Sequence, residues 1–263
     1  MTGSATTRMP VLFLGHGSPM NAIEDNAWSR AFRELAKELP KPRAILAVSA
    51  HWFGPGVLLT AQERPPTIHD FGGFPRELYE VQYPAPGDPE LAERVARSLA
   101  SEDATLSDEW GLDHGTWSVL RHLAPEADCP VVQLSLDARL APERHLELGR
   151  ALAPLRDEGV LVLGSGNLVH NLRDAFQRQR SGDASVPEWA QRFDAEAAEA
   201  IQMRDGDFLA RCVESDLGRL AQPTLDHYLP LLYVVGAAGE RDAVRFPIEG
   251  FDGSLSMRAV RFG

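Results

Sequence analysis

Short and almost uninterrupted apolar runs recur along the chain and predict its buried strands. They span residues 10–15, 43–50, 56–61, 130–136, 159–164 and 231–236. Near-continuous hydrophobicity is typical of strands that are covered on both faces, whereas strands with one solvent-facing side alternate apolar and polar residues. We therefore expect a central sheet whose two faces are both packed against other elements.

Between these runs, apolar residues recur at spacings of three and four, which is the pattern of amphipathic helices. Two such stripes consist of Trp28, Phe32, Leu35 and Leu39, and of Trp189, Phe193, Ala197 and Ile201. Further helices are predicted over residues 88–101, 115–123 and 142–153. The alternation of strands and helices predicts an α/β fold. We expect a single domain over residues 1–263, with a central mostly parallel or mixed sheet flanked by helices, and with residues 1–9 as a flexible N-terminus.

Three of the predicted strands end in residues that can carry chemistry. The run VLFL continues into GHGSP, AILAVSA into HW, and VLVL into GSGNLVHN, which puts His16, His51 and His170 at or just after strand ends. Ligands of open α/β sheets bind beyond the carboxyl ends of the strands, so parallel strands would carry these rings to one edge. His227, in LDHYLPLLYVVG, precedes the last apolar run, and its location depends on the direction of that strand.

His16, His51 and His227 are the candidate metal ligands. Neutral imidazole binds zinc and iron, and three rings leave coordination positions open for a substrate. The alternative is that each ring is an ordinary hydrogen-bonded histidine. Several histidines at strand ends, in contexts rich in glycine, serine or aromatic residues, favour the metal site. Gly15 and Gly17 beside His16 fit this interpretation, since they keep side-chain bulk away from the ring.

The other histidines differ in what their surroundings indicate. His114 follows Asp113 at the start of a predicted helix, where Asp113 either orients the ring or caps the helix, and both roles stay open. His69 lies in a stretch rich in proline and glycine, residues 63–75, which is predicted to form a lid or a pocket wall. His122 and His145 lie in charged helical segments, and no role is assigned to them.

Composition excludes several partners. The chain has 26 basic and 38 acidic residues, and its net charge of −12 would repel nucleic acid and anionic membranes. It has two cysteines, which is too few for a disulfide framework, and it lacks the run of about 18 apolar residues that would cross a bilayer. We expect a cytoplasmic protein that binds neither nucleic acid nor membrane.

Five motifs, taken together and in order, closely resemble the class III extradiol ring-cleavage dioxygenases, in particular their 4,5-DOPA dioxygenase extradiol-like branch. The motifs are GHGSPMNAI, AILAVSAHW, GLDHGTWSVL, GSGNLVHNL and LDHYLPLLYVVGAA. The resemblance implies one catalytic α/β domain with a non-haem metal, Fe(II) for the dioxygenase reaction and Zn(II) often bound as purified. Its substrates would be a DOPA-like or other small catechol and O2, and the protein can be a homo-oligomer.

The resemblance also assigns roles to individual residues. It implies that His16, His51 and His227 are the metal ligands, and that His170 is the acid/base histidine and can also count as a fourth ligand. It implies that His114 holds the substrate. Related enzymes that cleave protocatechuate have a glutamate at the third ligand position, where this chain has His227. That neutral ligand leaves the identity of the metal open.

Two other functions remain compatible with the same residues. A zinc hydrolase would use the three histidines to bind a zinc ion that activates water. A binding protein without enzymatic activity would keep the scaffold alone. Catalysis by a nucleophilic serine is disfavoured, because Ser165 in GSGN lacks the GxSxG elbow.

Overall fold

The computed structural model describes residues 8–263. Most of the N-terminal segment that we expected to be flexible, residues 1–9, lies outside the described residues. Met9 is described and is buried, and its N–H donates a hydrogen bond to the Arg156 carbonyl at 3.0 Å. The described chain therefore begins in a fixed position against the fold.

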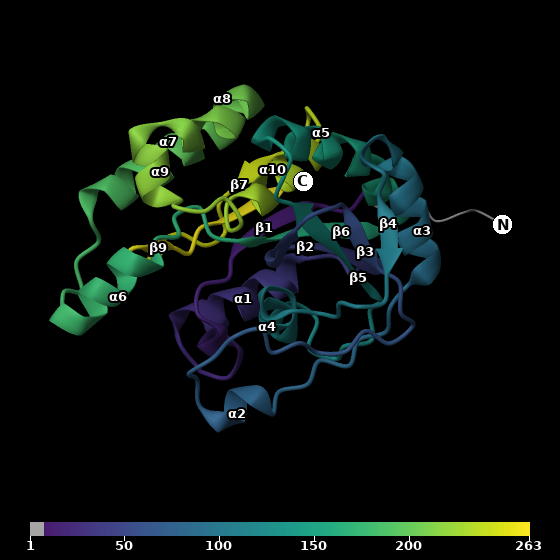
Figure 1. The fold of residues 1–263 in the computed structure, drawn as a ribbon, viewed down its shortest axis with the longest axis horizontal. Coiled ribbons are helices and arrows are strands. Elements are labelled where there is room, and N and C mark those ends of the chain that lie inside the picture. The colour runs from purple at the N-terminus through teal and green to yellow at the C-terminus, as the bar shows by residue number, and fades with distance from the viewer. Residues whose placement is uncertain (1–7) are drawn as a thin grey trace.

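A mixed sheet of eight strands forms the centre of the domain (Figure 1). Its strands, in chain order, are β1 (Val11–Gly15), β2 (Ala44–Gly54), β3 (Leu58–Thr60), β4 (Thr105–Ser107), β5 (Val131–Asp137), β6 (Val160–Gly166), β7 (Val244–Arg245) and β10 (Ala259–Phe262). Their spatial order is β4-β3-β5-β2-β6-β1-β10-β7. The central strands β5, β2, β6 and β1 are mutually parallel, while β10 pairs with β1 in the antiparallel direction. The fold prediction, an α/β domain with a mixed sheet, is confirmed.

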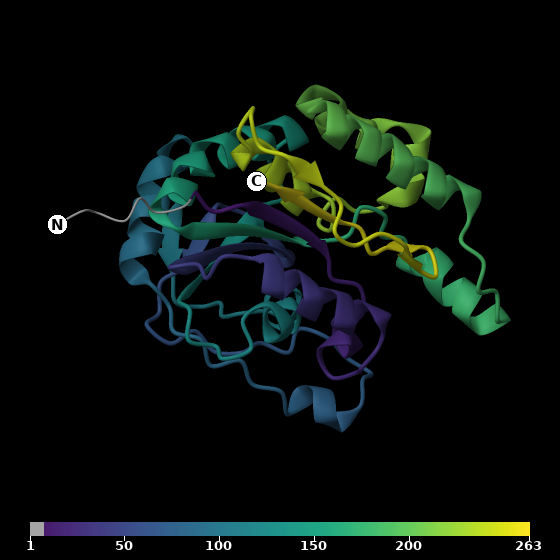
Figure 2. The same ribbon diagram turned by 180° about the vertical axis from the view of Figure 1, so that it is seen from behind.

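Helices and loops cover both faces of the sheet (Figures 1 and 2). The helices are α1 (Ala27–Glu38), α2 (Arg76–Tyr79), α3 (Pro89–Ser98), α4 (His114–Leu123), α5 (Pro142–Leu152), α6 (Leu172–Ser181), α7 (Glu188–Met203), α8 (Gly206–Arg211), α9 (Asp216–Ala221) and α10 (Leu229–Ala237). Short 3-10 turns span Pro19–Ala22, Ala100–Glu102, Ala153–Glu158 and Cys212–Glu214, and a hairpin joins β8 (Phe251–Asp252) to β9 (Leu255–Ser256). No helix within residues 8–263 is long and apolar enough to cross a membrane.

The alternation of side chains along each strand divides the core into two parts. In β1, Val11 and Phe13 belong to the part of the core that also contains residues of α3, α5, α7 and α10, while Leu12 and Leu14 belong to the part on the opposite face, with residues of α1 and α4. All four side chains are completely buried. This two-sided burial explains why the strands read as continuous apolar runs.

The prediction of a strand over residues 231–236 is wrong, because this segment belongs to helix α10. Almost every residue of α10 is buried, so its sequence is apolar on all sides, and such a run does not distinguish a buried helix from a buried strand. Pro230 in its first turn is a helix-start signal. Two glycines let neighbouring elements approach closely: a Cβ on Gly149 would lie 2.5 Å from the Tyr233 carbonyl oxygen, and one on Gly164 would lie 2.6 Å from that of Pro230.

Candidate metal centre

Five histidine rings from five segments of the chain meet at one edge of the sheet. His16 follows β1, His51 lies near the end of β2, His114 begins α4, His170 follows β6, and His227 comes just before α10. The parallel direction of β1, β2 and β6 accounts for three of them, as predicted from the strand ends. The pairing of β2 with β5 shifts register between Val48 and Phe53, so an irregularity in the strand surrounds His51.

Distances between ring centroids define the cluster. His16 lies 5.1 Å from His51 and 5.2 Å from His227, and His51 lies 5.0 Å from His227. His114 lies 3.7 Å from His51. His170 stacks on His227 with a centroid separation of 3.4 Å and an angle of 7° between the ring planes. The structure thus brings together all the predicted site residues.

The tautomer of His16 follows from its hydrogen bonds. The Ser165 hydroxyl donates to the Gly115 carbonyl at 2.5 Å, because a carbonyl oxygen can only accept. Its oxygen, 3.0 Å from His16 Nδ1, must then accept the proton of that nitrogen. The remaining nitrogen, His16 Nε2, therefore carries a lone pair.

The same reasoning applies to the other two predicted ligands. His227 Nδ1 donates to the Asp226 carboxylate at 2.5 Å, and His51 Nδ1 lies 3.3 Å from the Asp70 carboxylate. A carboxylate accepts only, so it favours the proton on Nδ1 and a lone pair on Nε2 in both rings. Carboxylate partners of this kind are typical of histidines that bind metals.

The contact between His16 and His51 tests whether these residues fit a metal ion. Their Nε2 atoms are 3.3 Å apart. With both protons on Nδ1, two lone pairs face each other, which is unfavourable unless a cation lies beside them. The donor set is therefore suited to a divalent metal that prefers imidazole nitrogen, such as iron or zinc.

His114 also has a nitrogen within reach of this centre. One nitrogen from each of His16, His51 and His114 lies within 4.8 Å of the others, so these three could hold an ion. The predicted set has His227 in place of His114. By ring centroids, His227 is nearer to His16 than His114 is, at 5.2 Å against 5.9 Å, but farther from His51, at 5.0 Å against 3.7 Å. The 4.8 Å grouping of nitrogens includes His114 and not His227.

Burial keeps the rings neutral, as metal binding requires. Desolvation, followed by the proximity of the other rings, lowers the pKa of His16 and of His227 well below 6.5. Desolvation followed by the charge of His114 lowers the pKa of His51 to about 3. Desolvation also lowers the pKa of His170 to about 4. At neutral pH these four imidazoles are uncharged and can donate lone pairs.

Asp113 caps helix α4, which decides one of the two roles left open for it. Its carboxylate accepts hydrogen bonds from the Thr116 N–H at 3.1 Å and from the Ser49 hydroxyl at 2.7 Å. The side chain is completely buried, and desolvation raises its pKa to about 6. His114 faces the cluster even so, and the carboxylate beside its ring belongs to Asp70.

The glycines that flank His16 allow a left-handed backbone conformation and a close approach of the C-terminal segment. Gly17 has a φ of +61°, which favours glycine, and a Cβ there would lie 2.6 Å from Met257 Sδ. A Cβ on Gly15 would lie 2.8 Å from the Met257 main chain. At both positions, the space that a side chain would take is occupied by Met257 of the C-terminal segment.

The histidines left without a role have ordinary hydrogen bonds. His122 Nε2 donates to the Asn21 carbonyl at 2.7 Å, and His69 Nε2 to the Val81 carbonyl at 3.0 Å. His145 Nδ1 is 3.1 Å from the Tyr233 hydroxyl. The sequence prediction missed Asp70 and Asp226. The only sequence signal for Asp226 is its position next to His227.

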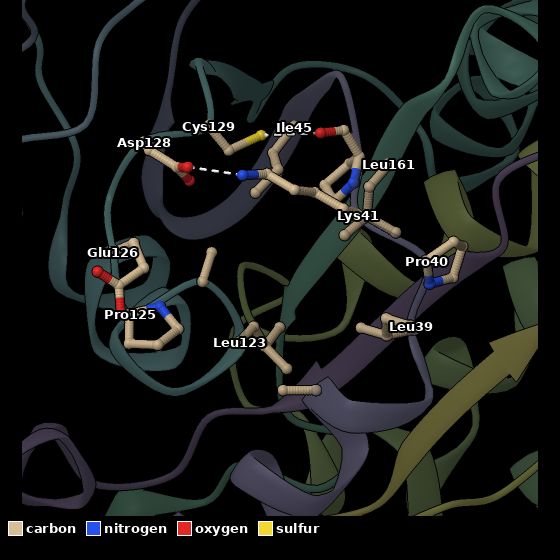
Figure 3. Close-up of a pocket in the computed structure, with 13 residues that line it drawn as sticks. Leu39, Pro40, Lys41, Ile45, Leu123, Pro125, Glu126, Asp128, Cys129 and Leu161 are labelled. Atoms are coloured by element: carbon tan, nitrogen blue, oxygen red, sulfur yellow. Dashed lines mark hydrogen bonds and ion pairs between the residues drawn. The ribbon is translucent and has the colours of Figure 1, made fainter.

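A cavity of about 220 Å³ lies away from the histidine cluster, near the start of β2 and β6 (Figure 3). Ile45 and Leu161 form part of its wall, and an ion pair of 2.6 Å joins Lys41 to Asp128 beside it. The Cys129 thiol adjoins this cavity, and burial raises its pKa to about 11. No histidine among the described residues lines this cavity, so it is not part of the candidate metal centre.

Comparison with known proteins gives a consistent result. Residues 10–255 match the family described as the catalytic LigB subunit of aromatic ring-opening dioxygenase. A protein of Escherichia coli K12 named 4,5-DOPA dioxygenase extradiol is 49% identical over 265 residues, which cover 98% of this chain and 96% of the relative. A protein of the same name from Beta vulgaris is 37% identical over 260 residues and 96% of each chain.

A solved structure supports the same conclusion. The crystal structure of an uncharacterized protein of Escherichia coli K12 superposes with a TM-score of 0.85 and 44% sequence identity. The match covers 97% of this chain and 100% of that one. The chain therefore belongs to the LigB family of aromatic ring-opening dioxygenases.

Proposed function

We propose that the protein is an Fe(II)-dependent extradiol dioxygenase that opens the ring of a small catechol with O2. The convergence of His16 and His51, whose Nε2 atoms are 3.3 Å apart, is the observation that supports it most. His16, His51 and His227 would hold the metal. His170, whose ring stacks on that of His227, is assigned to proton transfer, and ligation of the metal by His170 is the alternative role. Zn(II) is the alternative occupant of the same nitrogen donors.

The ferrous ion, when bound, supplies a centre at which catechol and dioxygen meet, which overcomes the slow reaction of triplet oxygen with an aromatic ring. Three protein ligands leave enough open positions for both reactants. The protein residues then have to bind and orient the catechol and to move its protons.

His170 is the acid/base residue of this proposal. Its pKa of about 4 makes the ring neutral at pH 7, so it can accept a hydroxyl proton from the catechol. Among residues 8–263, no side chain is hydrogen-bonded to its ring, and its stacking on His227 fixes it beside the predicted ligands. The negative charge of a bound catecholate raises the pKa of His170, so the ring can hold the proton and return it as the aromatic ring opens.

His114 and an aromatic wall would hold the substrate. Phe71 meets the His114 ring edge to face at 5.3 Å, and Trp117 lies 6.2 Å from Phe71. Aromatic side chains in this arrangement suit a flat ring as a ligand. Two relatives are named 4,5-DOPA dioxygenase extradiol, so we propose DOPA or a similar small catechol as the substrate. We also propose that the enzyme acts in the cytoplasm, where its two free thiols stay reduced.

Reconstitution of the metal-free protein tests the proposal. The protein is stripped with a chelator, loaded with Fe(II) without oxygen, and mixed with aerated solutions of DOPA and of methyl- and carboxyl-substituted catechols. We expect a yellow ring-fission product from at least one catechol, and none from the Zn(II)-loaded protein. Absence of product from every catechol would contradict the proposal, and oxygen-independent ester hydrolysis with Zn(II) would favour the zinc hydrolase.

A further inference from the structure

One carboxylate contacts two rings of the cluster that come from different elements. Asp70 Oδ2 lies 3.3 Å from Nδ1 of His51, which belongs to β2. Asp70 Oδ1 lies 3.0 Å from Nδ1 of His114, which begins α4. This is an ion-pair distance without hydrogen-bond alignment, and His114 Nδ1 has no hydrogen-bond partner among residues 8–263. Oδ1 also accepts a hydrogen bond of 2.9 Å from the His114 main-chain N–H. The Asp70 side chain is 15% exposed, so these contacts are largely shielded from water.

The loop that carries Asp70 is anchored by the two residues that precede it. The Ile68 N–H donates to the Leu112 carbonyl at 2.8 Å, and the Ile68 carbonyl accepts from Trp117 Nε1 at 2.8 Å. The His69 ring donates to the Val81 carbonyl at 3.0 Å. Of the two roles predicted for residues 63–75, these bonds favour a fixed pocket wall over a lid.

We propose that Asp70 is a positioning residue that keeps the proton of both His51 and His114 on Nδ1 and so leaves both Nε2 atoms free for the site. This inference rests on the proposed metal centre. A carboxylate beside two Nδ1 atoms stabilises the N–H form of each and opposes a lone pair there. His51 can then present its lone pair to a metal, and His114 can accept a hydrogen bond from a substrate hydroxyl.

The charge of Asp70 agrees with this role. Burial disfavours its ionised form, but the contact with His114 and the nearby His51 outweigh burial and lower its pKa. Asp70 is therefore a carboxylate at neutral pH and can only accept. Asn would keep the shape and the hydrogen bond from the His114 N–H, but its amide NH₂ would face one of the two rings and favour the opposite tautomer.

Nuclear magnetic resonance of the metal-free protein tests the inference directly. Long-range proton–nitrogen spectra distinguish the two tautomers of a neutral imidazole, and His51→Gln and His114→Gln assign the signals. In the unaltered protein we expect the Nδ1–H form for both rings. In Asp70→Asn we expect at least one of them to change to the Nε2–H form.

Zinc affinity, measured by competition with a chelator, provides the second measurement. We expect Asp70→Asn to bind Zn²⁺ roughly 10- to 100-fold more weakly. Glu80→Gln, which removes an exposed carboxylate paired with Arg76 in the neighbouring α2 region, is the matched control and should keep the affinity. Circular dichroism confirms that both variants fold.

The outcomes separate this inference from the proposed function. Nε2–H tautomers in the unaltered protein overturn it, whether or not Asp70→Asn folds. Unchanged zinc affinity in Asp70→Asn, or an equal loss in Glu80→Gln, overturns it as well. No catechol is used in either measurement, so a protein with the expected tautomers that opens no catechol would contradict only the proposed function.

Discussion

Adding a single methyl group at Gly115 should disturb the metal centre without removing any of its side chains. Gly115 is the second residue of α4, and a Cβ there would lie 2.5 Å from Ser49 Oγ and 2.8 Å from His51 Cδ2. In a helix, alanine is favoured over glycine by about 1 kcal/mol, whereas overpacking of a core costs about 1–3 kcal/mol. We expect Gly115→Ala to lower the free energy of unfolding by up to about 2 kcal/mol.

Gly115→Ala should also weaken metal binding. The new methyl group can be accommodated only if both the Ser49 hydroxyl and the His51 ring move, because both contacts are shorter than 3.0 Å, and movement of the ring changes the position of His51 Nε2. A loss of about 1.4 kcal/mol in binding free energy corresponds to tenfold weaker affinity, and we expect at least that loss for Zn²⁺. Chelator competition measures the affinity, and urea unfolding measures the stability.

Gly149→Ala is the matched control. Gly149 is also a helical glycine, and a Cβ there would lie 2.5 Å from the Tyr233 carbonyl oxygen, in the contact between α5 and α10. It should destabilise the fold at least as much, because the new Cβ meets main-chain atoms of Tyr233, and it should keep the zinc affinity. If Gly115→Ala binds Zn²⁺ as tightly as the unaltered protein, or Gly149→Ala loses as much affinity, the position assigned to His51 is refuted.

Four further predictions concern single side chains. His170→Gln should lose most ring cleavage but keep its metal content by elemental analysis, and a loss of metal would identify His170 as a ligand. His227→Ala should lose the metal, whereas His114→Ala should keep the metal and chiefly raise the KM for catechol. The reverse result would support His16, His51 and His114 as the metal ligands. Asp226→Asn should weaken Zn²⁺ binding about 10- to 100-fold in chelator competition, because His227 loses its carboxylate partner, and unchanged affinity would exclude that role. Burial lowers the pKa of His145 from 6.5 to about 4, so the unfolded chain binds the extra proton between these values. Stability should therefore fall as the pH drops through that window, by about 3 kcal/mol for this group, and urea unfolding of His145→Gln should show a shallower pH dependence.

The strand-end histidines could be predicted from sequence because they depend on local order. An apolar run followed by GHG places His16 directly after β1, whereas His51 still belongs to β2 and lies near its end, and parallel strands carry both residues to one edge. The ring-opening dioxygenase class inferred from five ordered motifs is confirmed by the family match over residues 10–255. The roles of the individual histidines stay predictions.

The parts that sequence reasoning missed depend on tertiary contacts. Residues 231–236 are apolar because α10 is surrounded by the core, and the side-chain pattern of a fully buried helix lacks a period that would identify it. Asp70 comes from a loop whose composition predicts a lid or a pocket wall, and only the fold brings its carboxylate to His51 and His114. The strand β10 has only four residues and pairs with β1 from the far end of the chain.

The stoichiometry of oxygen uptake tests the central claim most directly. The Fe(II)-loaded protein is mixed with its best catechol in an oxygen electrode while the absorbance of the ring-fission product is recorded. We predict that O2 consumed, catechol consumed and ring-opened product are equimolar, with no hydrogen peroxide released. Oxygen uptake that yields a quinone and peroxide, or no uptake at all, would contradict the assignment of this site to extradiol ring cleavage.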